Sequence, residues 1–484
     1  MTPRPRLLSV ACVALLVATS ACDNAVTPSP TAAGGTGELT AADFSALAQT
    51  ARSEVLPGSV DDVFFEMAAR HEGFAGAYLG PEGDIVLLST RPDEARASAR
   101  AIAGDMLGLM TFDDRTARGH RERAVTVEPA AFDFAELAAF RLAVEQTLTE
   151  SFSIVYTDVD ERANRVALGV DEAAGVPLGA VSAALVALGV PPDAFTVDTI
   201  PAIEFASGGP EAALPSAGVA GRASTLLTDF VRPIAGGVQI KTPDSGPNGC
   251  TLGVPVWHGS PGSQELGFLT ASHCTVIVGY NNGAQFGQPV GSTLISAEHE
   301  DPPLTNCGSG YSTNCELADV ALVDFTAQTH VLPGEVHLTN ASSGSGPGGK
   351  TVTGQSVKLF PSSTLVGQSM NKVGRTTGWT TGEVTGTCAN ISIPAIQPDV
   401  VQRSTRLRCY TRTNVPVQVG DSGAALFSIN YDPGPETGGF HGILSACAGC
   451  SETTIGFTSY YVSWAAVDNA LTTNVSFNSQ PVVN

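Results

Sequence analysis

Three short motifs supply the residue types that nucleophilic catalysis needs. His273 stands in Leu-Thr-Ala-Ser-His-Cys, Asp319 in Ala-Asp-Val-Ala-Leu and Ser422 in Gly-Asp-Ser-Gly. A serine hydroxyl is a poor nucleophile at neutral pH unless a base takes its proton and a third group fixes that base. The order His, Asp, Ser therefore predicts His273 as the base, Asp319 as its orienting carboxylate and Ser422 as the nucleophile.

The sequence around these residues predicts β-strands as the elements that position them. From Ile234 onward, short Val, Ile, Leu, Thr and Phe runs alternate with turn clusters such as Asn281-Asn-Gly and Pro433-Gly-Pro. Helical periodicity is nearly absent until residues 463–471. The pattern predicts an all-β part over 234–484, of the right size for two small barrels packed together.

Taken together, the three motifs resemble those of the chymotrypsin/trypsin family of serine endopeptidases. The resemblance implies two six-stranded antiparallel β-barrels with a C-terminal helix. It also implies an oxyanion hole made by the backbone N–H groups of Gly420 and Ser422. Asp324 is a rival for the orienting carboxylate, but Asp-Val-Ala-Leu fits the family pattern at Asp319.

Asp421 precedes the nucleophile and is expected to be buried beside a cation. The segment Met370-Asn-Lys-Val-Gly-Arg-Thr-Thr-Gly resembles a motif of the streptogrisin-like bacterial branch of the family. It implies Lys372, or as an alternative Arg375, as the partner of Asp421. A new N-terminus at Ile234 would then not be needed to form the site.

The substrate cleft is expected along Phe440 to Ser445, which resembles the family's cleft strand. Ser445 would support Asp319 from behind, and residues 445–447 would pair with a substrate backbone. Residues 416–419 and Gly456-Phe-Thr resemble the two pocket walls, and their lining predicts an apolar or aromatic residue before the scissile bond. The predicted substrate-binding residues are Val417, Val419, Ser445, Ala446 and Gly456.

Eight cysteines follow the first 22 residues, and an even set can pair fully. The resemblance implies a bridge beside the catalytic histidine, and the other pairs would close short loops. The expected disulfides are Cys250–Cys274, Cys307–Cys315, Cys388–Cys409 and Cys447–Cys450. A redox motif or half a zinc site with His441 are alternatives for Cys447-Ala-Gly-Cys. We expect no metal and no cofactor, because neither alternative has the sequence context it needs.

The N-terminus reads as an export signal over residues 1–22. Arg4 and Arg6 precede a short apolar run, and a small residue stands before Cys22. The segment resembles a bacterial lipoprotein signal, which implies lipidation of Cys22 and anchoring in the cell envelope. Cleavage after Ala21 and secretion is the alternative. Residues 23–38, rich in Thr, Pro, Ser and Gly, predict a flexible tether.

Residues 39–207 predict a small α+β domain with helices on one face of an antiparallel sheet. The stretch 158–205 resembles the pro-region of streptogrisin-like proteases, which implies a folding chaperone and inhibitor of the catalytic part. Retention for surface attachment or substrate capture is the alternative. Residues 208–233 predict an exposed linker that is cut during processing.

The amino-acid composition limits the classes of molecule that the chain is expected to bind. The net charge of −22 argues against nucleic-acid binding, because few Lys and Arg residues are available to neutralise phosphates. Of the 47 acidic residues, 31 precede residue 236, and the first lysine is Lys241, so the two parts differ in their charged residues.

The expected partners are protein or peptide substrates and the chain's own pro-domain. A catalytically silent surface-binding protein on the same fold is the alternative function. An α/β-hydrolase esterase is rejected because its nucleophile elbow is missing.

Overall fold

The computed structural model describes most of the chain after residue 37. The described ranges are 38–112, 114–206, 225–242, 249–275, 278–288, 294–306, 314–326, 330–340, 347–393, 405–430, 437–451 and 453–478. They all belong to one compact unit that runs from Glu38 to Asn484. The predicted signal, nearly all of the tether, Cys22, Cys307 and residues 207–224 lie outside the described residues.

Helices dominate the described residues before 207. They are α1 (Ala41–Glu54), α2 (Val60–Arg70), α3 (Pro92–Leu109), α4 (Asp114–Glu122), α5 (Phe134–Thr147) and α6 (Leu178–Ala187). Capping boxes start two of them: Thr40 caps α1 with Asp43, and Asp133 caps α5 with Glu136. These helices bury a hydrophobic core around Phe64, whose members come almost entirely from this part of the chain.

The strands of this part form two mixed arrangements. They are β1 (Phe74–Leu79), β2 (Ile85–Ser89), β3 (Val125–Pro129), β4 (Ile154–Asp160), β5 (Arg165–Asp171), β6 (Phe195–Ile200) and β7 (Ile203–Phe205). The pairs β1–β2 and β4–β5 are antiparallel, whereas β2–β3 and β5–β6 are parallel. The predicted single antiparallel sheet is therefore wrong. Helices connect β2 to β3 and β5 to β6, and a helical crossover returns a strand in the parallel direction.

The part after residue 233 is all-β apart from short helical segments, as predicted. Its strands are β8 (Ile234–Gly236), β9 (Gln239–Ile240), β10 (Cys250–Thr251), β11 (Val254–His258), β12 (Glu265–Thr270), β13 (Gln285–Gly287), β14 (Leu294–Glu300), β15 (Thr305–Asn306), β16 (Asn314–Glu316), β17 (Ala321–Phe325), β18 (Val331–Thr339), β19 (Val352–Pro361), β20 (Ser369–Gly374), β21 (Gly378–Ile393), β22 (Thr405–Thr413), β23 (Ala425–Phe427), β24 (Thr437–Ala448), β25 (Thr458–Ser463) and β26 (Val475–Ser476). The helix α7 (Trp464–Ala470) lies where helical periodicity appears in the sequence.

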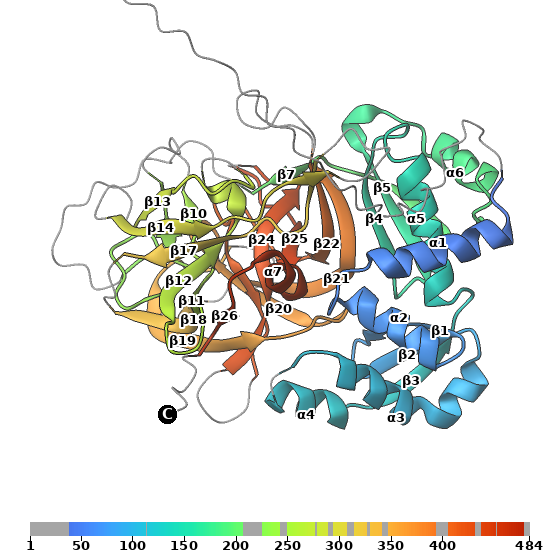
Figure 1. Cartoon of the computed structure of the whole chain (residues 1–484), viewed down its shortest axis with the longest axis horizontal. Helices are drawn as coiled ribbons and strands as arrows, with labels where there is room; N and C mark the ends of the chain where they lie inside the picture. The colour runs from blue at the N-terminus through green and yellow to red at the C-terminus, as the bar shows by residue number, and fades with distance from the viewer. Residues whose placement is uncertain are drawn as a thin grey trace, which may run out of the picture. The chain divides into compact units, whose positions relative to one another are not determined.

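Two sheets carry most of these strands. One is six-stranded, in the order β13-β14-β17-β12-β11-β26. The larger one follows β22-β25-β24-β23-β20-β21 and continues into the N-terminal strands β4, β5 and β6. Figure 1 shows β4 beside β21, where Tyr156 pairs with Ile391 in antiparallel register. The N-terminal part therefore extends a sheet of the C-terminal part.

The predicted exposed linker is partly buried. Leu227 and Val231 belong to the main hydrophobic core of the C-terminal part, and the N–H of Leu227 donates to the Lys350 carbonyl at 3.0 Å. Apolar side chains at these two positions explain why residues 225–233 pack inward. No helix within the described residues is long and apolar enough to cross a membrane.

Candidate active site

His273 and Asp319 meet through two hydrogen bonds. His273 lies in the 3-10 turn Ser272–Cys274 directly after β12, and Asp319 lies just before β17. Strands β12 and β17 are neighbours in the six-stranded sheet, so their ends bring the two residues together. His273 Nδ1 is 2.6 Å from Asp319 Oδ2, and the backbone N–H of His273 donates to Asp319 Oδ1 at 2.9 Å. This pairing leaves Nε2 facing away from the carboxylate.

Asp319 is completely buried and fully hydrogen-bonded. Ser445 Oγ donates to Asp319 Oδ2 at 2.6 Å, and the backbone N–H of Asp319 donates to the Tyr410 hydroxyl at 3.0 Å. Burial raises the pKa of Asp319, but the charge and hydrogen bonds of His273 together with the Ser445 hydroxyl outweigh it, so the pKa lies below its usual value. The carboxylate therefore stays charged. Asp324 contacts His258 and His299 instead of His273.

Ser422 lies in the turn before β23 and is held close to the His273 segment. Its carbonyl accepts from the N–H of Thr251 at 2.8 Å. The next residue, Gly423, has φ +85°, and a Cβ there would overlap Thr270 Oγ1 and the Thr251 carbonyl oxygen. Among the described residues, neither Ser422 Oγ nor His273 Nε2 has a hydrogen-bond partner, although both are buried. Two reactive atoms are thus left available.

Lys372 and Asp421 form a fully buried ion pair. Lys372 Nζ lies 2.9 Å from Asp421 Oδ2, and neither side chain is exposed. Thr377 Oγ1 donates to the same carboxylate at 2.6 Å, and the backbone N–H of Thr376 donates at 2.9 Å. Burial raises the pKa of Asp421, but Lys372 and Thr377 outweigh it and hold the pKa below its usual value. Of the two cations expected from the sequence, Lys372 takes this position.

Arg375 contacts the peptide of Gly420 instead. Its Nε donates to the carbonyl of Gly420 at 3.1 Å and to that of Gly249 at 2.9 Å. Thr251 Oγ1 donates to the same Gly420 carbonyl at 3.1 Å. Gly420 has φ +95°, which a glycine adopts without strain. These bonds fix the carbonyl of Gly420 and so restrict the backbone of the residue whose N–H is the predicted oxyanion donor, a role for Arg375 that the motif alone does not reveal.

The strand β7 from the N-terminal part lies along β24, which holds the residues predicted to line the substrate cleft. It pairs antiparallel with β24, with Phe205 opposite Ala446 and Glu204 opposite Cys447. The Phe205 ring stacks on the His273 imidazole, with centroids 4.6 Å apart and planes inclined by 29°. The N–H of Gly420, a predicted oxyanion donor, donates to the Ala206 carbonyl at 2.8 Å. We did not predict Phe205 or Ala206 as site residues. Their signal was a short, mainly apolar segment, interrupted by Glu204, that ends directly before the Gly- and Pro-rich linker.

The predicted pocket walls adjoin each other. The N–H of Val417 donates to the Gly456 carbonyl at 3.0 Å, and the reverse bond is 2.8 Å long. Val417 and Ala446 are fully buried, and the half-buried Val419 packs against the cluster that contains Val417. The predicted substrate-binding residues therefore lie around β24 and the turn that carries Ser422.

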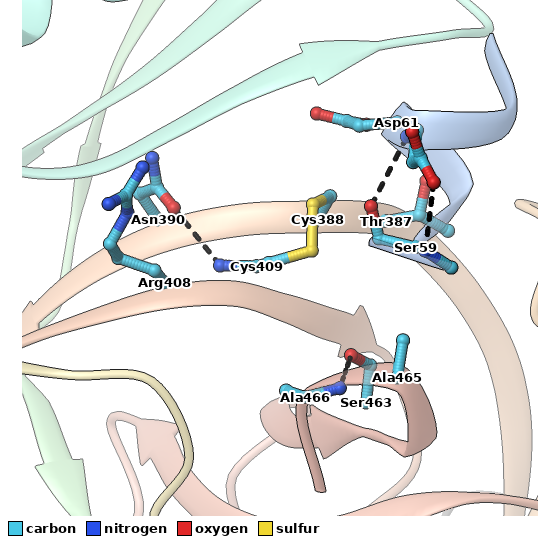
Figure 2. The surroundings of a disulfide bond; sticks show 12 residues. Ser59, Asp61, Thr387, Cys388, Asn390, Arg408, Cys409, Ser463, Ala465 and Ala466 are labelled. Atoms are coloured by element: carbon cyan, nitrogen blue, oxygen red, sulfur yellow. Dashed lines mark hydrogen bonds between the residues drawn. A yellow bond between two sulfur atoms is a disulfide. The ribbon is translucent and has the colours of Figure 1, made fainter. Parts of the chain in front are cut away.

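Disulfides join several of these segments. Cys250–Cys274 ties β10 to the turn that holds His273, and Cys447–Cys450 closes a short loop after the cleft strand. Cys388–Cys409 joins β21 to β22 and lies near Ser59 and Asp61 at the start of α2 (Figure 2). Cys315 is also disulfide-bonded.

Among the described residues, one group away from His273 could hold a metal ion. It comprises His258, His299 and Asp324, on the strands β11, β14 and β17. His258 Nε2 lies 2.8 Å from Asp324 Oδ1, and His299 Nδ1 lies 3.1 Å from Asp324 Oδ2. Cys447 and Cys450 are bonded to each other, and His441 contacts Thr364 and Ser428, so these residues do not form the alternative zinc site.

No protein-family model matches. Over 208 residues, 43% of this chain and 94% of the relative, the sequence is 29% identical to Serine protease 2 of Streptomyces fradiae. Among solved structures, Nocardiopsis protease (NAPase) is 21% identical, with 50% of this chain and 98% of that chain covered and a TM-score of 0.33. Cellulomonas bogoriensis chymotrypsin is 20% identical, with coverages of 51% and 99% and a TM-score of 0.32. The sequence similarity to Serine protease 2 agrees with the resemblance of this chain to the chymotrypsin/trypsin-like serine endopeptidases of the streptogrisin-like bacterial branch.

Proposed function

We propose that the protein is a serine endopeptidase that uses His273, Asp319 and Ser422. One observation carries the proposal. Asp319 holds Nδ1 of His273 at 2.6 Å, while Nε2 of His273 and Oγ of Ser422 are both buried without a partner among the described residues. An imidazole oriented in this way can act as a base only through Nε2. The sequence similarity to a serine protease supports the same reaction class.

The reaction follows from these roles. His273 Nε2 takes the proton of Ser422 while Oγ attacks the substrate carbonyl carbon, and Asp319 stabilises the imidazolium that forms. The N–H groups of Gly420 and Ser422 stabilise the oxyanion. The imidazolium then gives its proton to the leaving amine, which departs and leaves an acyl-enzyme. Water, activated by the same imidazole, hydrolyses that ester and restores Ser422.

The proposed architecture is two β-barrels with the site between them. The six-stranded sheet that carries His273 and Asp319 would be one barrel. The strands from β18 to β25, with Ser422 before β23, would supply the other. A site assembled from two packed units explains why residues so distant in sequence converge.

The N-terminal part is proposed to inhibit the enzyme and to act as a template during folding. Arg406 pairs with Glu145 at 3.0 Å, and Thr387 Oγ1 donates to Glu161 at 2.6 Å, so buried polar groups join the two parts. The edge of β4 pairs with β21, so the N-terminal part offers a preformed strand on which a strand of the catalytic part can align. Chains rich in long-range strand pairs fold slowly, and such an edge would lower the barrier.

Export to the bacterial cell envelope, or secretion, is proposed from the N-terminal signal. Lipidation of Cys22 would anchor the protein, whereas cleavage after Ala21 would release it. Mass spectrometry of the mature N-terminus distinguishes the two. A diacylated Cys22 supports the anchor, and an unmodified Cys22 or a start elsewhere contradicts it.

The catalytic proposal is tested by Ser422→Ala against the wild-type chain. Processed wild-type protein should react with a fluorophosphonate probe at Ser422 and hydrolyse a protein substrate such as casein. The variant should do neither, at an unchanged melting temperature. Wild-type protein that stays inert in both assays after its N-terminal part has been removed would support the silent-binding alternative.

A further inference from the structure

We infer that Ser422 cleaves this chain's own peptide bond after Ala206, and that the enzyme prefers a small residue before the bond it cuts. The inference rests on the proposed endopeptidase function and deepens it. It names a substrate sequence and a processing site upstream of the predicted 208–233 linker.

Backbone hydrogen bonds place Ala206 at the reacting position. Its N–H donates to the Ser445 carbonyl at 3.0 Å, and its own carbonyl accepts from the Gly420 N–H at 2.8 Å. The Gly420 N–H is the donor assigned to the developing oxyanion. A carbonyl polarised by that donor is the one that Ser422 can attack.

The register of β7 fixes which side chains face the pocket. Ala446, Cys447 and Ala448 pair with Phe205, Glu204 and Ile203 respectively. Side chains alternate along a strand, so Phe205 and Ala206 point to opposite sides. Phe205 stacks on His273, while Ala206 points away from it. Shifting the strand by one residue would bury the phenyl ring in the pocket and lose the stacking.

Ala206 belongs to a buried cluster of mainly apolar side chains. The Ala206 side chain is fully buried in a cluster that includes Val417, Leu444, Cys447 and Tyr461, each of them 0% exposed. Close-packed interiors resist added volume, so a larger side chain would have to displace these neighbours. We therefore expect alanine and serine to be accepted before the scissile bond. Of the apolar or aromatic residues expected from the lining, this packing favours the small apolar ones.

The chemical step balances with water alone. Ser422 Oγ bonds to the carbonyl carbon of Ala206 and loses its proton to His273, which passes it to the amine of the following residue as the peptide bond breaks. Water then cleaves the ester and leaves a carboxylate at Ala206. Until β7 departs, the same contacts exclude other substrates. Phe205 covers His273, and the Ala206 carbonyl accepts the hydrogen bond of the Gly420 N–H that another substrate would need.

The first test is mass spectrometry of the full chain, expressed as wild type and as Ser422→Ala. Wild-type protein should yield a fragment ending at Ala206 and another starting at Ser207, and the variant should yield neither. A wild-type protein that hydrolyses casein but whose first cut lies within 208–233 overturns the inference and leaves the proposed function intact. Inertness towards casein and towards the fluorophosphonate probe, even after the N-terminal part has been removed, overturns both.

Ala206→Phe tests the pocket in the chain itself. Cleavage after residue 206 should slow at least about tenfold, since pocket misfits of this kind cost that much or more. Ala206→Ser should restore cleavage. Ala187→Phe, at an exposed position of α6, is the matched control and should process at the wild-type rate. Equal processing of Ala206→Phe and the control would overturn the small-residue pocket.

Peptides test the same preference apart from folding. Processed enzyme should hydrolyse Ile-Glu-Phe-Ala-Ser-Gly with a kcat/KM at least about ten times that for Ile-Glu-Phe-Phe-Ser-Gly. The cut in the first peptide should follow alanine. A preference for the second peptide, at normal fluorophosphonate reactivity, would overturn the inference without touching the triad.

Discussion

Lys372 and Asp421 are paired 2.9 Å apart with neither side chain exposed, directly beside the proposed nucleophile. The pair means that an internal lysine supplies the cation at this position. A newly cut N-terminus at Ile234 is not needed for it, because Lys372, Thr376 and Thr377 already contact the carboxylate.

Lys372→Met tests this arrangement. It would leave a buried carboxylate without its cation, and breaking such a pair costs about 3–5 kcal/mol. We expect urea unfolding to show that loss, with a fall in kcat of the surviving folded enzyme. Lys350→Met changes the same atoms at an exposed position and should be neutral. A stable, fully active Lys372→Met would show that Asp421 has another sufficient partner.

Asp319→Asn tests the orienting carboxylate. An amide at this position allows the wrong imidazole tautomer, and loss of the carboxylate in such a triad lowers kcat by about four orders of magnitude. KM should change little, because Asp319 is buried behind His273. The control is Asp324→Asn, which touches only His258 and His299 among the histidines of the described residues. Comparable losses in the two variants would contradict the assignment.

Arg375→Ala tests the support of the oxyanion donor. Removing an oxyanion donor itself costs about 10²–10³ in kcat, and loosening the Gly420 peptide should cost less, about 10- to 100-fold. The loss should appear in kcat more than in KM, since the oxyanion contact strengthens in the transition state. Arg408→Ala, at a surface arginine paired with Glu54, should leave both constants unchanged.

Release of the N-terminal part should depend on pH. Burial raises the pKa of Asp158 and of Glu161 well above the usual carboxyl value where they lie against Gly386 and Thr387 of β21. Exposed carboxyls titrate near about pH 4, so the separated part loses these protons at a lower pH than the complex does. The N-terminal part should therefore bind most tightly below about pH 4. Its binding should weaken as the pH rises through the raised pKa values of Asp158 and Glu161.

Gel filtration of the cleaved two-chain protein at pH 5 and pH 8 measures this dependence. The complex should persist at the lower pH and dissociate more at the higher one. Asp158→Asn with Glu161→Gln should flatten the difference, because neither amide titrates. An unchanged pH dependence in that double variant would assign the effect to other groups.

Local patterns in the sequence were sufficient for much of the fold. Helical periodicity at residues 463–471 predicted the place of α7, because the apolar spacing of a helix is set by residues close in sequence. Short apolar runs between turn clusters predicted the all-β part, because the two-residue period of a strand is also set by residues close in sequence. The direction of β3 and β6 was missed, because parallel or antiparallel pairing depends on the path of the whole connection.

The sequence by itself determined the chemistry that the chain can attempt, since His273, Asp319, Ser422, Gly420 and Lys372 each stand in a recognisable short motif. Only the tertiary structure decided what Arg375 holds, which residues of 225–233 are buried, and that Ala206 lies on the Gly420 N–H. The physical reason is the same in each case. These contacts join segments far apart in the chain, and their partners are set by strand register and by packing of separate cores, which leave no local pattern in the sequence.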